Sequence, residues 1–283
     1  MELRRRFVFR GNAAAFGGRI VRPQDVVLEA PGASSLTVSG GRSTWSTKDV
    51  RFGDFVRLRS ASTFAEGLFD DTKKAIALSH GKVPEETLTT TTRVRAEVKE
   101  LVVGGAPQFK VKSVRASLTG SSPAASYEPS LKVEDETAID GVSIDGHQLD
   151  VELERAVFQR YDTRAKLLTA VDDPKFVKAN GRYFYMNTPA SGGQPPARGR
   201  LVRESGYILA TIVKQITWRG DPFPGAVIDE NSVIVPEFGT IYFGEILISA
   251  NARRLTMLRL RLGSPTGGEG SFVEVDTNGS WSI

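Results

Sequence analysis

The residues best placed to do chemistry lie in one short stretch, AIDGVSIDGHQLD, at residues 138–150. His147 is one of 2 histidines in the chain, and Asp140 and Asp145 precede it closely. One imidazole with two carboxylates suits a divalent cation such as Ca²⁺, Mn²⁺ or Mg²⁺, and a carboxylate can also orient a histidine for proton transfer. His147, Asp140 and Asp145 are therefore the candidate metal or acid–base site.

The same stretch has a structural interpretation that competes with the metal site. Asp150, Glu152 and Glu154 alternate with apolar residues, as on the solvent-facing side of a strand. Each Asp-Gly pair favours a tight hairpin turn, and the acids do not match the D-x-[DN]-x-[DN]-G pattern of a calcium-binding loop. We expect a turn followed by a strand, with a divalent metal as the alternative and no other cofactor.

Glu245, in TIYFGEILIS (240–249), is the candidate catalytic residue. On an alternating strand it shares a face with Phe243 and Leu247, and the opposite face is apolar too, so its carboxylate should be partly buried. A buried carboxylate without a partner has a raised pKa and can act as a general acid or base. The alternative, which we favour, is a structural ion pair with an arginine of the next strand: Arg253, Arg254, Arg259 or Arg261.

Three aromatic residues are candidates for contacting a ligand. Trp45 and Trp218 lie beside turn residues, and Tyr185 lies in YFYMN, just before a Gly/Pro-rich segment at 187–200. An aromatic ring near a loop end can stack on a sugar or another flat ligand, although tryptophan in such positions more often packs against the core. We name Trp45, Trp218 and Tyr185 as the candidate ligand-binding residues.

Composition excludes several kinds of site. The chain has 0 cysteines, which rules out disulfides, Cys–zinc sites and thiol catalysis. It has no G-x-S-x-G, H-E-x-x-H, Walker A or dinucleotide-binding motif. These absences leave few catalytic options in the sequence.

Charge and hydropathy bear on the partners and the compartment. The net charge is +4, and the basic runs at 4–10 and 253–262 alternate with apolar residues, so we expect solvated strand faces and no nucleic-acid partner. No uninterrupted apolar run is long enough for a transmembrane helix, so the expected protein is soluble. Its compartment stays open: it is either cytoplasmic or exported after loss of a signal.

The elements expected to position these residues are mostly strands. Short alternating runs of Val, Ile, Thr and Phe are separated by turns that draw on 28 glycines and 14 prolines. The pattern predicts a mainly β fold of antiparallel sheets, either a sandwich or a partly open barrel, with two or three short helices. Residues 89–119 predict a long hairpin, and a change of phase near Ser113 predicts a β-bulge.

Helices are expected in two regions. Thr63 and Glu66 match a capping box at the start of a helix that Gly81 would end. A short helical pair is expected after Asp162 and Asp173, each of which can cap the helix that follows it.

The domain organisation depends on one segment. TGSSPAASYEPS (119–130) has the composition of a linker, which predicts a β-rich part with one helix at 1–125 and a second part with the helical pair at 126–283. The alternative is one continuous domain in which the C-terminal strands complete a sheet begun by the N-terminal ones.

The sequence alone favours a non-enzymatic protein that binds a ligand or builds an assembly through its loops and sheet surfaces. The expected partner is a second copy of the chain or a carbohydrate or other polar ligand. The alternative is a carboxylate-dependent hydrolase acting on a carbohydrate or another polar substrate, with Glu245 and the acids from Asp140 to Asp150 as its components.

Overall fold

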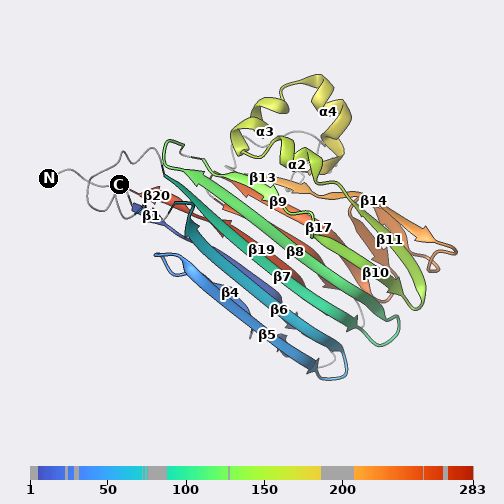
Figure 1. The fold of residues 1–283 in the computed structure, drawn as a ribbon. Coiled ribbons are helices and arrows are strands. Elements are labelled where there is room, and N and C mark those ends of the chain that lie inside the picture. The colour runs from blue at the N-terminus through green and yellow to red at the C-terminus, as the bar shows by residue number, and fades with distance from the viewer. Residues whose placement is uncertain are drawn as a thin grey trace.

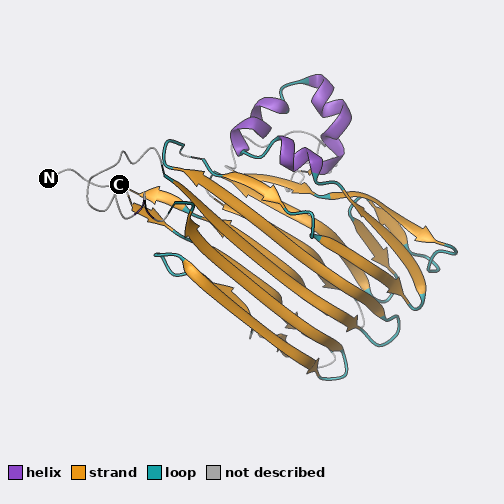
Figure 2. Ribbon diagram, in the orientation of Figure 1, coloured by secondary structure: helices purple, strands orange, loops and turns teal. Residues whose placement is uncertain are grey.

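The computed structural model describes residues 6–22, 25–28, 32–71, 73, 75, 88–126, 128–185, 207–250, 252–263 and 267–282. Two large antiparallel sheets lie face to face, and three short helices lie together near one end of the strands (Figures 1 and 2). The predicted mainly β fold of antiparallel sheets with a few short helices is therefore confirmed, and its form is that of a sandwich.

The first sheet has eight strands, which run in the order β14-β11-β10-β8-β7-β6-β5, with β9 beside β8. Its strands are β5 (Gly41–Phe52), β6 (Val56–Phe69), β7 (Thr89–Val103), β8 (Phe109–Pro123), β9 (Ser130–Val133), β10 (Ala138–Ile144), β11 (His147–Leu153) and β14 (Val213–Arg219). The predicted hairpin at 89–119 is confirmed as β7 and β8, which pair along their whole length.

The second sheet has ten strands in the order β12-β13-β17-β18-β19-β2-β3; β4 also pairs with β2, β16 with β17, and β15 with β16. Its strands are β2 (Gly11–Ile20), β3 (Val26–Leu28), β4 (Ala33–Ser35), β12 (Phe184–Tyr185), β13 (Tyr207–Thr211), β15 (Val227–Asp229), β16 (Ser232–Val235), β17 (Gly239–Ser249), β18 (Ala252–Leu262) and β19 (Gly268–Asn278). A small separate pair joins β1 (Arg6–Val8) to β20 (Ser280–Ser282).

Each large sheet contains strands from both sides of residue 125. The segment 119–130 includes the end of β8 and the start of β9, which pair with each other through Leu118↔Val133 and the positions beyond it. A division at residue 125 would therefore cut through both sheets.

The core lies between the sheets, where β2 and β19 pack on β6, β7 and β8. On β7 the residues Val94, Ala96 and Val98 are fully buried, whereas Arg93, directly before Val94, is exposed. Small side chains such as Ala13 and Ala65 let the sheets approach, and aromatic rings fill the wider parts of the interface.

The alternation of inward and outward residues changes phase at one level across the eight-stranded sheet. On β7 the neighbours Lys99 and Glu100 both face solvent, and on β8 Lys112 and Ser113 lie between buried valines. Asp49, Glu100 and Gly141, on alternate strands, have φ of 53°, 51° and 62°. We call this level the first inversion row; it consists of Asp49, Arg59, Glu100, Lys112 and Gly141.

The ten-stranded sheet has a matching level, at which two consecutive residues of each strand face the core. We call it the second inversion row; it consists of Gly244, Met257, Val273 and Ala15 on neighbouring strands. Gly244 and Val273 have φ of 58° and 59°. The register of β7 and β8 is the same on both sides of Ser113, so the predicted phase change there is real but is not a bulge in one strand.

The helix predicted from Thr63 is wrong over residues 63–69, which form a strand instead. Residues 56–69 form β6, which pairs with β5 on one side and β7 on the other. The Thr63 hydroxyl is buried and donates to the Gly32 carbonyl at 2.9 Å, instead of capping a helix. Two long ladders of backbone hydrogen bonds outweigh the local preference for a helix. Farther along the predicted helix, Lys73 and Ala75 are helical, and the Ala75 N–H donates to the Asp71 carbonyl at 2.9 Å. The other residues of that helix after Asp71 lie outside the described part of the chain.

The predicted helical pair is confirmed and follows a shorter helix, α2 (Ala156–Arg160). Thr163, not Asp162, caps α3 (Arg164–Ala170) by accepting a hydrogen bond from the Lys166 N–H. Asp173 caps α4 (Pro174–Asn180) as predicted, and a single 3₁₀ turn follows (Gly181–Tyr183). Phe158, Leu167 and Phe176 bury the apolar sides of the three helices.

Candidate functional site

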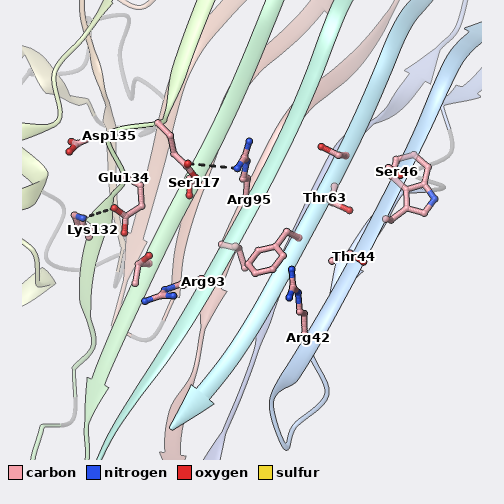
Figure 3. A pocket seen from close by; sticks show the side chains of 16 residues that line it. Arg42, Thr44, Ser46, Thr63, Arg93, Arg95, Ser117, Lys132, Glu134 and Asp135 are labelled. Carbon is pink, nitrogen blue, oxygen red and sulfur yellow. Dashed lines mark ion pairs between the residues drawn. The ribbon is translucent and has the colours of Figure 1, made fainter. Parts of the chain in front are cut away.

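A broad groove of about 1230 Å³ crosses the outer face of the eight-stranded sheet (Figure 3). We call it the sheet groove; it is lined by Arg42, Thr44, Trp45, Ser46, Ser62, Thr63, Phe64, Arg93, Val94, Arg95, Ser117, Thr119, Lys132, Glu134, Asp135 and Glu136. Alternation builds its floor, because residues between the core positions of β5, β6, β7 and β8 must face outward. The floor is therefore mostly hydroxyl and guanidinium groups.

The arginines of the sheet groove are only loosely paired. Arg93 lies 3.9 Å from Glu66, and Arg95 lies 3.7 Å from Glu136, so neither contact has the geometry of a strong hydrogen bond. The guanidinium of Arg42 lies over the Phe64 ring, 5.1 Å from its centroid. Figure 3 shows the arginines of β5 and β7 reaching over the same surface. These groups keep hydrogen-bonding capacity for a ligand.

Acidic residues mark one end of the sheet groove. Glu134, Asp135 and Glu136 follow β9, and Lys132 pairs with Glu134 there (Figure 3). The hollow continues past the groove on both sides, since a pocket of about 440 Å³ shares Ser46 and Ser62 with it. Another of about 490 Å³ shares Thr119, Lys132 and Asp135. Together these hollows form a trough across the strands.

Glu97 anchors a cluster of cations beside the groove. It is 8% exposed, accepts a hydrogen bond from Arg115 and lies 3.6 Å from both Arg95 and Lys99. Burial alone would raise the pKa of the Glu97 carboxyl, but the Arg115 hydrogen bond and the three positive charges outweigh it and lower the pKa. One carboxylate is shared by three cations, which leaves the cluster positively charged.

Charge is unevenly distributed between the two outer faces of the sandwich. On the strands of the eight-stranded sheet from β5 to β10, basic side chains outnumber acidic ones: Arg42, Lys48, Arg51, Arg57, Arg59, Arg93, Arg95, Lys99, Lys110, Lys112, Arg115 and Lys132, against Asp49, Glu66, Glu97, Glu100 and Asp140. On the outer face of β2, β17, β18 and β19, four arginines meet four acids: Arg19, Arg254, Arg259 and Arg261, with Glu245, Glu269, Glu274 and Asp276.

Glu245 lies on that second face, in a cleft of about 790 Å³. Arg259 donates two hydrogen bonds to its carboxylate, at 2.7 and 2.8 Å, and a third at 3.2 Å to Glu269. The same guanidinium lies 3.9 Å from the centroid of the Tyr242 ring. The hydrogen bond from Arg259 to Glu245 is the main cause of the raised pKa of Arg259. The predicted structural ion pair is confirmed with Arg259 as the partner, and a catalytic role for Glu245 stays a prediction.

Asp276 is a titratable residue that the sequence did not single out. Burial raises the pKa of its carboxyl to about 6, against the attraction of Arg254 and with the help of Glu274. Its Oδ1 atom is buried and accepts no hydrogen bond from any described residue. Its regular alternation with Glu274 on β19 is typical of an exposed strand face, which is why no sequence signal marked it.

The acids around His147 have separate structural partners. Asp145, with φ 45°, forms the β10–β11 turn with Gly146, and its side chain accepts the Gln108 N–H at 2.7 Å. Asp140 accepts a hydrogen bond from Ser113 at 3.2 Å.

His147 has a different partner from the two acids, since its Nδ1 lies 3.0 Å from the Asp221 carbonyl oxygen. The structure therefore does not bring His147, Asp140 and Asp145 together as metal ligands. Across the described residues, no three His, Asp or Glu side chains form a group that could hold a metal ion.

The structure brings His147 close to one of the predicted aromatic residues. Its ring centroid lies 6.5 Å from that of Trp218 and 5.6 Å from that of Phe223, edge to face in both cases. Trp218 also packs against the core. These contacts hold the loop after β14 against β11.

The other two predicted aromatic residues lie elsewhere. Trp45 borders the sheet groove, but its half-buried ring packs on Phe16, with ring centroids 6.5 Å apart, and fills the space beside Gly32. Its packing role is thus clear from the contacts. Tyr185 pairs through its backbone with Leu209, and its side chain lies outside the described part of the chain.

Comparisons with known proteins place the chain in a family. Among the described residues, no helix is long and apolar enough to cross a membrane. No curated protein and no solved structure matches the chain. The family model described as Domain of unknown function (DUF8256) matches residues 7–249, which is most of the chain, and the protein therefore belongs to that family.

Proposed function

We propose that this protein is a non-enzymatic binding protein and that the sheet groove holds its ligand, an extended carbohydrate. The observation that carries the proposal is the floor of the groove, where hydroxyl and guanidinium groups from four neighbouring strands line about 1230 Å³ of open space. A rigid sheet holds these groups at fixed spacings, so a ligand does not have to order them on binding.

The chemistry of the floor suits a polyhydroxylated chain. Ser and Thr hydroxyls both donate and accept hydrogen bonds, and guanidinium groups donate several in one plane. Thr44, Ser46 and Ser62 lie on the β5 and β6 part of the floor, and Ser117 and Thr119 on the β8 part. Sugar hydroxyls can replace the water molecules that such groups would otherwise bind.

A carboxylate-dependent hydrolase is the alternative, and Glu245 would be its acid or base. Both oxygens of Glu245 already accept hydrogen bonds from Arg259, which commits the carboxylate to a structural partner. The contacts of Glu245 therefore support the binding function better than the hydrolytic one.

The test is a binding screen followed by a groove-filling variant. We expect the wild-type protein to bind at least one member of a panel of soluble neutral and acidic polysaccharides in affinity electrophoresis, with the affinity then measured by calorimetry. Ser62→Trp should obstruct the groove and weaken that binding about tenfold or more, because Ser62 lines both the groove and the hollow next to it.

Thr217→Trp is the matched control, since Thr217 is exposed on the same sheet at β14, away from the groove. Both variants should keep the wild-type melting temperature. The proposal fails if no polysaccharide binds, or if Ser62→Trp binds as tightly as Thr217→Trp.

A further inference from the structure

Three cations form a row near the hairpin end of the eight-stranded sheet. Arg51 on β5 is directly opposite Arg57 on β6, and Val102 of β7 separates Arg57 from Lys110 on β8. We call Arg51, Arg57 and Lys110 the basic row. All three are exposed, and none makes an ion pair with a carboxylate among the described residues.

The basic row lowers the stability of the fold. Like charges directly opposite each other on neighbouring strands are destabilising, and a carboxylate at Val102 or beside it would relieve the repulsion. The other arginines of this face illustrate the contrast, because Arg59 pairs with Glu100 at 2.6 Å and Arg115 with Glu97. A cluster of cations without carboxylate partners attracts anions from solution, and a bound anion would relieve the repulsion.

The basic row is continuous with the sheet groove. The first inversion row turns two successive levels of the sheet outward between the basic row and the groove. These levels carry four cations and three acids: Lys48, Arg59, Lys99 and Lys112, with Asp49, Glu100 and Asp140. Arg51 lies nine positions after Arg42 on β5, a span of about 30 Å at the rise of an extended strand. The acids Glu134, Asp135 and Glu136 lie at the β9 side of the groove, away from the basic row, so this outer face has an anion-attracting part and an anion-repelling part.

We propose that the sheet groove and the basic row together bind one acidic polysaccharide, a chain whose carboxylate or sulfate groups alternate with free hydroxyls. The inference rests on the proposed function and names the ligand class. Cations mixed with Ser and Thr hydroxyls match a polymer that carries both anions and hydroxyls. A single-stranded nucleic acid would need aromatic platforms for its bases. The aromatic residues that line the groove are Phe64, which Arg42 covers, and Trp45, whose ring packs on Phe16.

The experiment compares polygalacturonate and heparin with neutral dextran on the full chain. We expect the two acidic polymers to bind and the dextran to bind at least about tenfold more weakly. Raising the salt concentration from 50 to 200 mM should weaken the acidic interaction by about tenfold or more, since it rests on several ion contacts.

The variant Arg51→Gln/Arg57→Gln/Lys110→Gln should lose about tenfold in affinity for polygalacturonate and show a smaller salt dependence. The matched control Lys175→Gln/Lys178→Gln/Arg261→Gln removes the same charge from α4 and the other sheet, at exposed positions, and should bind as the wild type does. If the glutamine variant proves unstable, Arg51→Lys/Arg57→Lys keeps the charge and should keep the affinity.

Three outcomes would overturn the inference: dextran binding as well as polygalacturonate, an unchanged affinity in the glutamine variant, or duplex DNA displacing the polysaccharide at lower concentration. In the first two cases a loss of binding in Ser62→Trp would still support the groove as a carbohydrate site, so the two proposals fail separately.

Discussion

The buried carboxyl of Asp276 should make the protein less stable as the pH rises. Its pKa in the fold is about 6, against a usual value of 3.8, because burial disfavours the charged form. Between these two values the native state binds more protons than the unfolded chain does, so the free energy of unfolding falls as pH rises through this window. The loss of stability caused by ionising the buried Asp276 carboxyl is fully present above about pH 6 and absent well below pH 3.8.

The variant Asp276→Asn removes the charge and keeps the shape. A pKa difference of this size corresponds to an upper limit of about 3 kcal/mol, and the solvent that still reaches the side chain reduces it to about 2 kcal/mol. We therefore expect Asp276→Asn to stabilise the protein by about 2 kcal/mol near pH 8 and by about 0.5 kcal/mol or less near pH 4.

Urea unfolding of the wild type and the variant at both pH values measures this difference. Asp54→Asn, in the exposed turn between β5 and β6, is the matched control and should change stability by less than about 0.5 kcal/mol at either pH. An Asp276→Asn variant that is destabilised near pH 8, or equally stabilised at both pH values, would refute the reasoning.

Three further predictions follow from single contacts. His147→Ala should leave Mn²⁺ binding unchanged in a calorimetric titration while lowering stability by about 1 kcal/mol, because the hydrogen bond and ring contacts are structural; loss of metal binding would contradict this. Gly244→Ala should cost about 2 kcal/mol in urea unfolding, since its φ is 58° and a Cβ would lie 2.9 Å from a side-chain carbon, whereas Gly105→Ala, with open space around it, should cost less than about 1 kcal/mol. Glu245→Gln should cost about 1–2 kcal/mol and show coupling to Arg259→Gln in a double-mutant cycle; additive effects would argue against the pair.

Local patterns predicted the strands well and placed the start of one helix wrongly. The alternation of Val94, Ala96 and Val98 with charged neighbours depends on one strand alone, so it could be recognised from the sequence. The capping box at Thr63 is also a local signal, but the outcome there was decided by β5 and β7, which pair with β6 from both sides. A local signal cannot report that competition.

The candidate site was harder to predict because it is assembled from distant parts of the chain. Glu245 and Arg259 come from consecutive strands, and their pairing could be inferred from the sequence. The sheet groove draws on β5, β6, β7, β8 and β9, whose alignment depends on the register. Arg51 and Arg57 carried a usable signal, since they flank the short turn at 53–55 and a tight hairpin places such residues opposite each other.

The two inversion rows constrain how this family can change its length. A residue inserted or deleted within one strand normally turns the rest of that strand over, exposing its apolar side chains. Here the inward and outward sides of every strand that crosses an inversion row are exchanged at the same level of the sheet. Buried residues of neighbouring strands therefore stay aligned only if the exchange remains at that level on all of these strands. Insertions and deletions should therefore be confined to the hairpin loops, and the distance from each loop to its row should be the most constant length in the chain.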